Sequence, residues 1–397
     1  MVSISRAAGA LRAVANTCLL PSSLGSGLAM ALAFAVAGTA SAAQPQAALG
    51  EPVNRYASGA NIYGLLEDGE IHPWHVKGKV WLMAGQPGES NVVVLVGDEG
   101  VLVVDTGAKS MAPKLLEKIR QLAEQQDGAQ QAVRLIVNTN GLGDHIGGNE
   151  TLREGGRRII AGEEAAAANA FSGGGAAIWA HQNVLSRLVD ETAAGGPNAP
   201  SEAQWPSDAV DQDVYGMVFT NEAVQMHHMR KSTTDGQLMV LFRQSDVIAA
   251  GDVLNMTSYP LIDVARGGTI DGELIALNRL IDMIVPDDQV SGGTVVIPGH
   301  GRLTDLGDVA RYTVMVTTIR NRVQFYKNQG KSLDQVLALN PSAEYDERWS
   351  AKGGPGSARE FLTAVYNTLP RKGPTFFTME TITTVPATGP EAAKRRF

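Results

Sequence analysis

The segment that decides the fold is NTNGLGDHIGGNE, residues 138–150. It follows an apolar run, AVRLIV (132–137), which is typical of a buried strand. Asp144 and His145 stand side by side just after this strand, and a Gly-Gly turn follows them. Carboxylate oxygen and imidazole nitrogen are good zinc ligands, so the segment predicts part of a metal site at a strand end. The alternative is that Asp144 only caps the helix that follows.

Residues 1–42 are predicted to be an export signal. Arg6 and Arg12 give it a basic start, LAMALAFAVAG (28–38) an apolar core, and Ala40-Ser41-Ala42 a cleavage motif. An uncleaved membrane anchor is the alternative, although a membrane span needs about 20 apolar residues and this core is shorter. We therefore expect a periplasmic or secreted protein that begins at Ala43 and has no membrane attachment after cleavage.

The composition excludes several classes of partner and of site. The 397 residues carry 33 basic and 41 acidic side chains, a net charge of −8, and the signal removes only basic ones. An acidic chain without a basic cluster is a poor candidate for binding nucleic acid or anionic membranes. The single cysteine, Cys18, lies in the signal. A metal in the mature chain must therefore be held by His, Asp, Glu, Asn or water.

The chain after the signal is predicted to have three parts: an N-terminal arm (43–78), a main domain (79–330) and a partly helical C-terminal extension (331–397). Strands are expected at 91–96, 100–107, 134–139, 157–160, 223–229, 237–242, 246–252 and 294–298. Helices are expected at 112–126, 177–191, 272–284, 306–328 and 357–369, with a loop at 192–213. Runs of strands with helices before, between and after them predict two sheets packed face to face and covered by helices.

Five short blocks occur in an order that resembles the metallo-β-lactamase superfamily. They are VVDTG (103–107), NTNGLGDHIGGNE (138–150), STTDGQLMVLF (232–242), AAGDVL (249–254) and PGHG (298–301). The resemblance covers roughly residues 79–305. It implies an α/β fold, the four-layer αββα sandwich of that family, and metal-dependent hydrolysis.

The metal ligands depart from the family pattern in one half of the site. The family signature is His-x-His-x-Asp-His, and here Asn140 and Leu142 occupy the first two histidine positions. A third histidine usually precedes the TDG stretch, where this chain has Thr233. The resemblance therefore implies that the first of two metal sites lacks its ligands. Leu142 is expected to fill the volume of the lost histidine, and Asn140 to donate a hydrogen bond to substrate or to the attacking water.

The other half of the site matches the family. Asp144, His145 and His300 match the second metal site, and Asp252 matches the carboxylate that bridges the two metals. The resemblance implies one Zn²⁺ per chain, with Asp252 or Asn255 as the fourth ligand. His300 as an ordinary loop histidine and Asp252 as a hydrogen-bonding group behind the ligands are the alternatives.

Two further residues receive a role. Asp105 is read as a structural aspartate that organises its loop. His228 is a less favoured substitute for a lost ligand, because it lies on a strand beside His227 and only one of the two can face the site.

The leading functional hypothesis is an exported hydrolase of small molecules. One Zn²⁺ would activate water for attack on an electrophilic carbon in an ester, lactone, amide or activated aryl halide, with Asp144 and Asp252 as catalytic carboxylates. A looser resemblance links the site to single-zinc hydrolytic dehalogenases of chlorinated aromatics. The alternative is a catalytically silent binding protein; a true β-lactamase is a weaker possibility, because the metal that polarises the lactam carbonyl lacks its ligands. A homodimer is among the assemblies that the sequence allows.

Overall fold

The computed structural model describes residues 69–84, 89–126, 128–157, 175–196, 199–289 and 292–377. The predicted export signal, most of the N-terminal arm and the end of the strand expected at 157–160 lie outside these ranges. Within them, no helix is both long enough and apolar enough to cross a membrane.

The first sheet has seven strands in the order of the chain. β1 to β4 pair in antiparallel fashion, and β4 to β7 pair in parallel. The strands are β1 (His72–Lys77), β2 (Val80–Ala84), β3 (Val92–Gly97), β4 (Gly100–Val104), β5 (Val133–Val137), β6 (Ala177–His181) and β7 (Asp208–Val210).

The second sheet has five strands in the order β12-β11-β10-β9-β8. Its pairs are antiparallel except for β11 and β12, which run in parallel. The strands are β8 (Val214–Phe219), β9 (Glu222–His228), β10 (Leu238–Phe242), β11 (Val247–Asn255) and β12 (Val295–His300).

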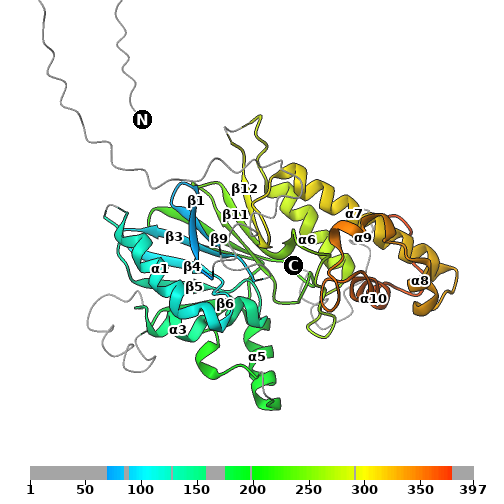
Figure 1. Cartoon of the computed structure of the whole chain (residues 1–397), viewed down its shortest axis with the longest axis horizontal. Coiled ribbons are helices and arrows are strands. Elements are labelled where there is room, and N and C mark those ends of the chain that lie inside the picture. Colours follow the sequence, from blue (N-terminus) through cyan, green and yellow to red (C-terminus); the bar gives the residue numbers. More distant parts are fainter. Residues whose placement is uncertain are drawn as a thin grey trace, which may run out of the picture. The chain divides into compact units, whose positions relative to one another are not determined.

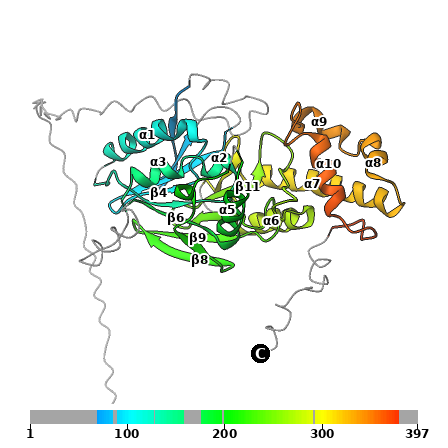
Figure 2. The same cartoon turned by 90° about the horizontal axis from the view of Figure 1, so that it is seen from below.

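The two sheets pack face to face, and helices cover both outer faces (Figure 1, Figure 2). Strand β3 is buried on both sides: Val93 and Leu95 pack against the second sheet, and Val92 and Val94 pack with helix α1. This double burial explains the unbroken apolar run that the strand shows in the sequence. The predicted four-layer αββα sandwich is confirmed.

The helices fall into two groups. One group accompanies the first sheet: α1 (Ala112–Glu124), α2 (Gly143–Ile146), α3 (Asn149–Glu154) and α5 (Gln182–Ala194). The other covers the second sheet and continues to the C-terminal end: α6 (Ile270–Met283), α7 (Leu306–Asn328), α8 (Leu333–Leu339), α9 (Ala343–Trp349) and α10 (Ala358–Thr368).

The C-terminal extension shares the core of the second group. Val336, Phe361 and Val365 are buried in the same hydrophobic cluster as Leu277 of α6 and Val316 of α7. The helix expected at 357–369 is present as α10, whereas α8 and α9 were not predicted. The extension is therefore a structural part of the domain, and it reaches the site described below.

Three sequence predictions were wrong in part. The N-terminal arm was expected to reach residue 78, but its last part forms β1, which pairs with β2. The helix expected at 177–191 is a strand followed by a helix, because residues 177–181 pair between β5 and β7. A run of five mostly apolar residues is too short to distinguish the period of a helix from that of a strand. The loop expected at 192–213 contains the short strand β7.

Candidate metal centre

The polar residues singled out in the sequence lie at the ends of neighbouring strands. Asp105 follows β4, the segment with Asp144 and His145 follows β5, and His300 ends β12. Asp252 lies within β11, which pairs in parallel with β12. The fold therefore brings together side chains that are up to 195 residues apart in the sequence, counted from Asp105 to His300.

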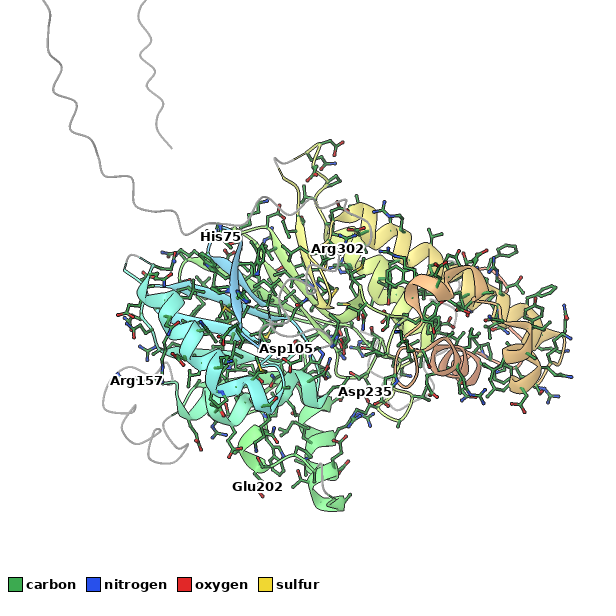
Figure 3. The ribbon with its side chains drawn as sticks, in the orientation of Figure 1. His75, Asp105, Arg157, Glu202, Asp235 and Arg302 are labelled. Carbon is green, nitrogen blue, oxygen red and sulfur yellow. The ribbon has the colours of Figure 1, made fainter. Side chains whose placement is uncertain are left out.

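Asp105 fixes the orientation of His145. Its backbone has φ 59°, which is unusual for a residue with a side chain, and its carboxylate accepts hydrogen bonds from the Thr139 backbone N–H (2.8 Å) and hydroxyl (2.7 Å). The same carboxylate lies 2.8 Å from Nδ1 of the fully buried His145. Figure 3 labels Asp105 at the end of β4. With Nδ1–H donated to Asp105, Nε2 keeps its lone pair for a metal. The loop-organising role expected for Asp105 thus includes holding a ligand.

Asp144, His145 and His300 form a compact set of potential ligands. One ligand atom from each lies within 4.8 Å of those of the other two. Nε2 of His300 is 2.9 Å from Oδ2 of Asp144, and Nε2 of His145 is 3.9 Å from the same oxygen. These three residues are the ones that the sequence assigned to the retained metal site.

Asp252 contacts both histidines. Its Oδ2 lies 3.1 Å from Nε2 of His145, and its Oδ1 lies 3.0 Å from Nδ1 of His300. Despite these distances, His145 Nε2, His300 Nδ1 and Asp252 Oδ1 have no aligned hydrogen-bond partner among the described residues. Buried polar atoms are rarely left without a partner, and among these three it is Nε2 of His145, which also faces Asp144, that fits a bound cation.

The donor set fits a zinc ion. One carboxylate and two imidazoles make the three protein ligands of a catalytic zinc site, whose fourth position is left for water. In a tetrahedron with bonds of about 2.0–2.1 Å, neighbouring ligand atoms are about 3.3 Å apart. The separations of 2.9 and 3.9 Å around Asp144 Oδ2 lie on either side of this value.

The electrostatics of the cluster favour a bound cation. Burial lowers the pKa of His300, but Asp252 and the hydrogen bond with Asp144 outweigh it and raise that pKa to about 9. Burial also lowers the pKa of His145, but the charges of Asp252 and Asp105 outweigh it. The pKa of His145 is therefore well above its ordinary value. Burial raises the pKa of Asp144 and Asp252, but the two histidines lower both pKa values overall. The carboxylates therefore stay ionised and draw positive charge, protons or a metal, to this point.

The half of the site without histidines is filled by a hydrogen-bonded network. The Asn140 amide donates to Oδ2 of Asp252 (3.1 Å) and to Oε1 of Gln237 (3.3 Å), and its oxygen accepts from the Leu142 backbone N–H (2.8 Å). The Thr233 hydroxyl donates to the same Gln237 oxygen (2.9 Å). Asn140, Thr233 and Gln237 are fully buried. Asn140 was expected to donate a hydrogen bond to substrate or to the attacking water. Its amide instead donates to Gln237 and to Asp252, and it holds Asp252 in place.

Gln237 was not singled out in the sequence. It stands just after the TDG stretch, two residues beyond Asp235, and one apolar run follows it directly. A polar side chain at the start of a buried strand was the only local signal. Its role became visible only through contacts with two other segments.

Asn255, one of the two candidates for the fourth ligand, has other partners. The side-chain oxygen of Asn255 accepts hydrogen bonds from Thr257 N–H (2.9 Å), Thr257 hydroxyl (2.8 Å) and Ser258 N–H (3.1 Å). An amide oxygen that already accepts three hydrogen bonds has little capacity left for a metal. Of the two candidates for a fourth ligand, the geometry therefore favours Asp252.

His228 lies away from the cluster. Its ring stacks on that of His181 with the centroids 3.6 Å apart, and its Nε2 is 2.8 Å from the Asp235 carbonyl oxygen. The idea that His228 replaces a lost ligand is therefore wrong.

Two glycines make room for the cluster. Gly251 has φ +53°, and a Cβ there would meet the side chains of Gln237 and Thr139 at 2.5 and 2.7 Å. A Cβ on Gly299 would lie 2.6 Å from Oδ1 of Asp252. Both contacts are shorter than packed atoms allow, so the glycines of AAGDVL and PGHG let β11 and β12 bring Asp252 and His300 together.

A cavity of about 730 Å³ opens beside the cluster, with Leu142 and Asp144 in its wall. The other walls come from residues 260–266 and from residues 354–367, which include part of α10. Leu142 thus borders the cavity. Among the described residues, none between 175 and 213 lines this cavity.

Comparison with known proteins agrees with this architecture. The family model of the metallo-β-lactamase superfamily matches residues 85–300. No curated protein shows significant sequence similarity to the chain.

Several solved structures are similar in fold. A metallo-β-lactamase from Pontibacter korlensis is 16% identical, with a TM-score of 0.44, over 62% of this chain and 99% of that one. The sec-alkylsulfatase Pisa1 from Pseudomonas sp. is 15% identical, with a TM-score of 0.51, over 77% of this chain and 54% of its own. A double mutant of PisA1 is 16% identical, with a TM-score of 0.54, over 75% and 50%. This chain thus spans about half the length of the alkylsulfatase.

At these identities the likeness to solved structures concerns the fold alone. The family match is the stronger result, because it covers more than half of the chain and contains all four residues of the cluster, from Asp144 to His300. The chain belongs to the metallo-β-lactamase superfamily.

Proposed function

We propose that the protein is an exported hydrolase that uses one Zn²⁺ to activate water for attack on an electrophilic carbon. The observation that carries this proposal is the compact set of Asp144, His145 and His300, whose ligand atoms lie within 4.8 Å of one another. The buried Nε2 of His145, which has no aligned partner in the described chain, supports it. Hydrolysis is the chemistry expected of the superfamily, and an ester, lactone, amide or activated aryl halide offers the required carbon.

Each residue of the cluster has a distinct task in this proposal. When bound, a zinc ion lowers the pKa of a coordinated water to about 7. Asp144, His145 and His300 would hold the ion. Asp105 keeps His145 in the tautomer that leaves Nε2 free, through the contact of 2.8 Å with Nδ1.

Asp252 is proposed as the second catalytic carboxylate. It is 1% exposed, contacts both histidines, and is held ionised at neutral pH by their charges, although burial alone would raise its pKa. An ionised carboxylate at this point is able to complete the ligand set or to orient the attacking water as a hydrogen-bond acceptor. Asn140 fixes its position from the side of the emptied half.

Zinc content and hydrolysis test the proposal together. The purified mature protein is expected to contain close to one equivalent of zinc by inductively coupled plasma mass spectrometry. It is expected to hydrolyse at least one member of a panel of aryl esters, lactones, amides and chlorinated aromatics. Two equivalents would mean that other residues rebuild the first site. No zinc after reconstitution, and no hydrolysis, would favour a silent binding protein.

Export is tested separately. Mass spectrometry of periplasmic material is expected to find Ala43 at the N-terminus, because the Ala40-Ser41-Ala42 motif precedes it. Intact material that still begins at Met1 would overturn the cleavage prediction but leave the hydrolase proposal untouched.

A further inference from the structure

The cavity beside the cluster is large enough to bind an organic molecule of two rings. Its volume of about 730 Å³ lies within the range of about 300–1,000 Å³ that is usual for small-molecule sites. Because Asp144 is both a potential metal ligand and part of the cavity wall, a molecule in the cavity would reach the cluster.

The wall of the cavity is mainly apolar. It brings together aliphatic and aromatic side chains from three separate segments of the chain: Leu142, Pro260, Leu261, Val264, Phe361 and Ala364. Val264 is 45% exposed, so part of this apolar wall faces the open cavity. Burying this surface against an apolar ligand would be favourable.

The one cation among the described lining residues has its charge already neutralised. Arg266 contacts Asp263 through Nη1 (2.7 Å) and Glu191 through Nη2 (2.8 Å), and its Nε also donates to Glu191 (2.9 Å). Every nitrogen of the guanidinium is thus engaged by one of two carboxylates. The fork that would recognise a carboxylate, phosphate or sulfate on a ligand is occupied.

The other ionisable groups in the wall are acidic: Asp144, Asp263, which is paired with Arg266, and Glu360. Glu360 lies in the first turn of α10, with an exposed side chain, and it borders the same cavity. A negative charge on a ligand would be repelled by Glu360 and would find no free partner at Arg266. A neutral apolar group meets no such penalty.

We propose that this cavity binds the uncharged, hydrophobic part of the substrate and excludes substrates that carry a negative charge there. The proposal rests on the hydrolase function proposed above and adds its substrate class: neutral esters or amides with an aromatic or alkyl group of one to two rings. Glu360 is a specificity-determining residue, and α10 of the C-terminal extension supplies it.

A matched series of substrates tests the proposal on the zinc-loaded enzyme. Naphthyl acetates share one scissile bond and differ only at the far ring, which carries a methoxy, a carboxylate or a trimethylammonium group. The kcat/KM for the neutral acetate is expected to exceed that for the carboxylated one by about tenfold, the effect of one unfavourable charge at a partly solvated site. Equal values for the two acetates would overturn the proposal.

Variants at position 360 assign the effect to one side chain. Glu360→Lys is expected to raise kcat/KM for the carboxylated acetate by about threefold to tenfold, and to lower it for the ammonium acetate, each relative to the neutral acetate. Glu124→Lys on α1 makes the same change in net charge at an exposed position outside the cavity, and it should leave the preference unchanged. If both variants shift the preference equally, the net charge of the protein and not the cavity sets it.

Binding without turnover separates this proposal from the hydrolase proposal. Isothermal titration calorimetry with the corresponding naphthols should show binding of the methoxy form and at least tenfold weaker binding of the carboxylated form. The preference should persist in the His145→Ala variant, whose metal site is broken. A protein that hydrolyses no acetate but keeps this preference would contradict only the hydrolase function. Equal binding of the two naphthols would refute the cavity assignment.

Discussion

The two halves of the site both consist of buried polar side chains, but they satisfy these side chains in different ways. In the retained half, Asp144, His145 and His300 place ionisable ligand atoms within 4.8 Å of one another. In the emptied half, Asn140, Thr233 and Gln237 are fully buried and neutral, and they bond to one another or to Asp252. Only the first half leaves buried nitrogen atoms without an aligned partner in the described chain.

This difference shows what the loss of three histidines means physically. An abandoned metal site would leave polar atoms without partners, each costing about 1–3 kcal/mol in the interior. Here Asn140 donates to Gln237 and Asp252 and accepts from the Leu142 backbone N–H. Its donation to Asp252 stabilises a carboxylate that a cation would otherwise stabilise. The emptied half is thus a hydrogen-bonded part of the polar core, and it positions the retained half through Asp252. Four predictions test that division.

The largest effect is expected from His145→Ala. The variant should lose its zinc, from one equivalent to none, and its hydrolytic activity should fall to the uncatalysed rate, because one of three strong ligands is gone. Metal analysis and turnover on the best substrate of the panel check this. His75→Ala, at an exposed histidine, is the matched control. A His145→Ala protein that keeps both zinc and activity would show that the site lies elsewhere.

The second prediction contrasts histidines inside and outside the cluster. His145 and His300 lie beside carboxylates, whereas burial and the charges of Arg279 and Arg243 lower the pKa of His227 from 6.5 to about 4. Between pH 6.5 and 4 the unfolded chain binds a proton at this position that the folded chain does not. The contribution of His227 to stability is therefore complete above pH 6.5 and falls as the pH decreases to about 4, by about 3 kcal/mol in all.

His227→Gln should remove this part of the acid sensitivity. Urea unfolding of chelator-treated protein at pH 7 and pH 4.5 should show a smaller loss of unfolding free energy in the variant, by about 2–3 kcal/mol. His75→Gln changes an exposed histidine and should keep the wild-type slope. An unchanged slope in His227→Gln would mean that His227 does not remain neutral in the folded protein.

The third prediction concerns the network of the emptied half. Asn140→Ala removes hydrogen bonds to Asp252, Gln237 and the Leu142 backbone, and it should lower the free energy of unfolding by about 2 kcal/mol. Because Asp252 loses its support, turnover should fall by about tenfold while one equivalent of zinc remains. Asn183→Ala, which removes one bond to the Asp235 carbonyl outside the cluster, should leave turnover unchanged. Loss of zinc from Asn140→Ala would instead make Asn140 part of the metal site.

The smallest effect is expected from Leu142→His. The substitution restores one of three missing ligands, which is too few for a second zinc site, so the metal content should stay at one equivalent. Leu142 is half-buried at the cavity wall, so the change in unfolding free energy should stay within about 1 kcal/mol. Preference within the ester panel should shift toward more polar substrates. Leu142→Met is the conservative control, and a second equivalent of zinc in Leu142→His would show that Asn140 and Thr233 are able to ligate.

Much of the fold could be predicted from local pattern. The helix over 306–328 was located at its observed ends, since its residues repeat the helical spacing over six turns and Asp305 caps it. Strands such as 92–97 were visible because they are buried on both faces and read as unbroken apolar runs. The strand at 177–181 was misread as helix, because five residues do not separate the two periods and only its place between β5 and β7 decides.

The site, like the fold, has features that the sequence predicts and features that only the tertiary structure decides. The residue types of Asp144, His145 and His300, their order, and the absence of cysteine from the mature chain are properties of the sequence, and they sufficed to predict a histidine–carboxylate site. Three matters depended on the tertiary structure: that Asn140 donates to Asp252, that Asn255 spends its oxygen on its own turn, and that α10 walls the cavity. The reason is physical. A ligand's chemistry belongs to its side chain, but the partner that a buried amide or carboxylate finds is set by segments distant in the chain, and only folding brings those within hydrogen-bonding distance.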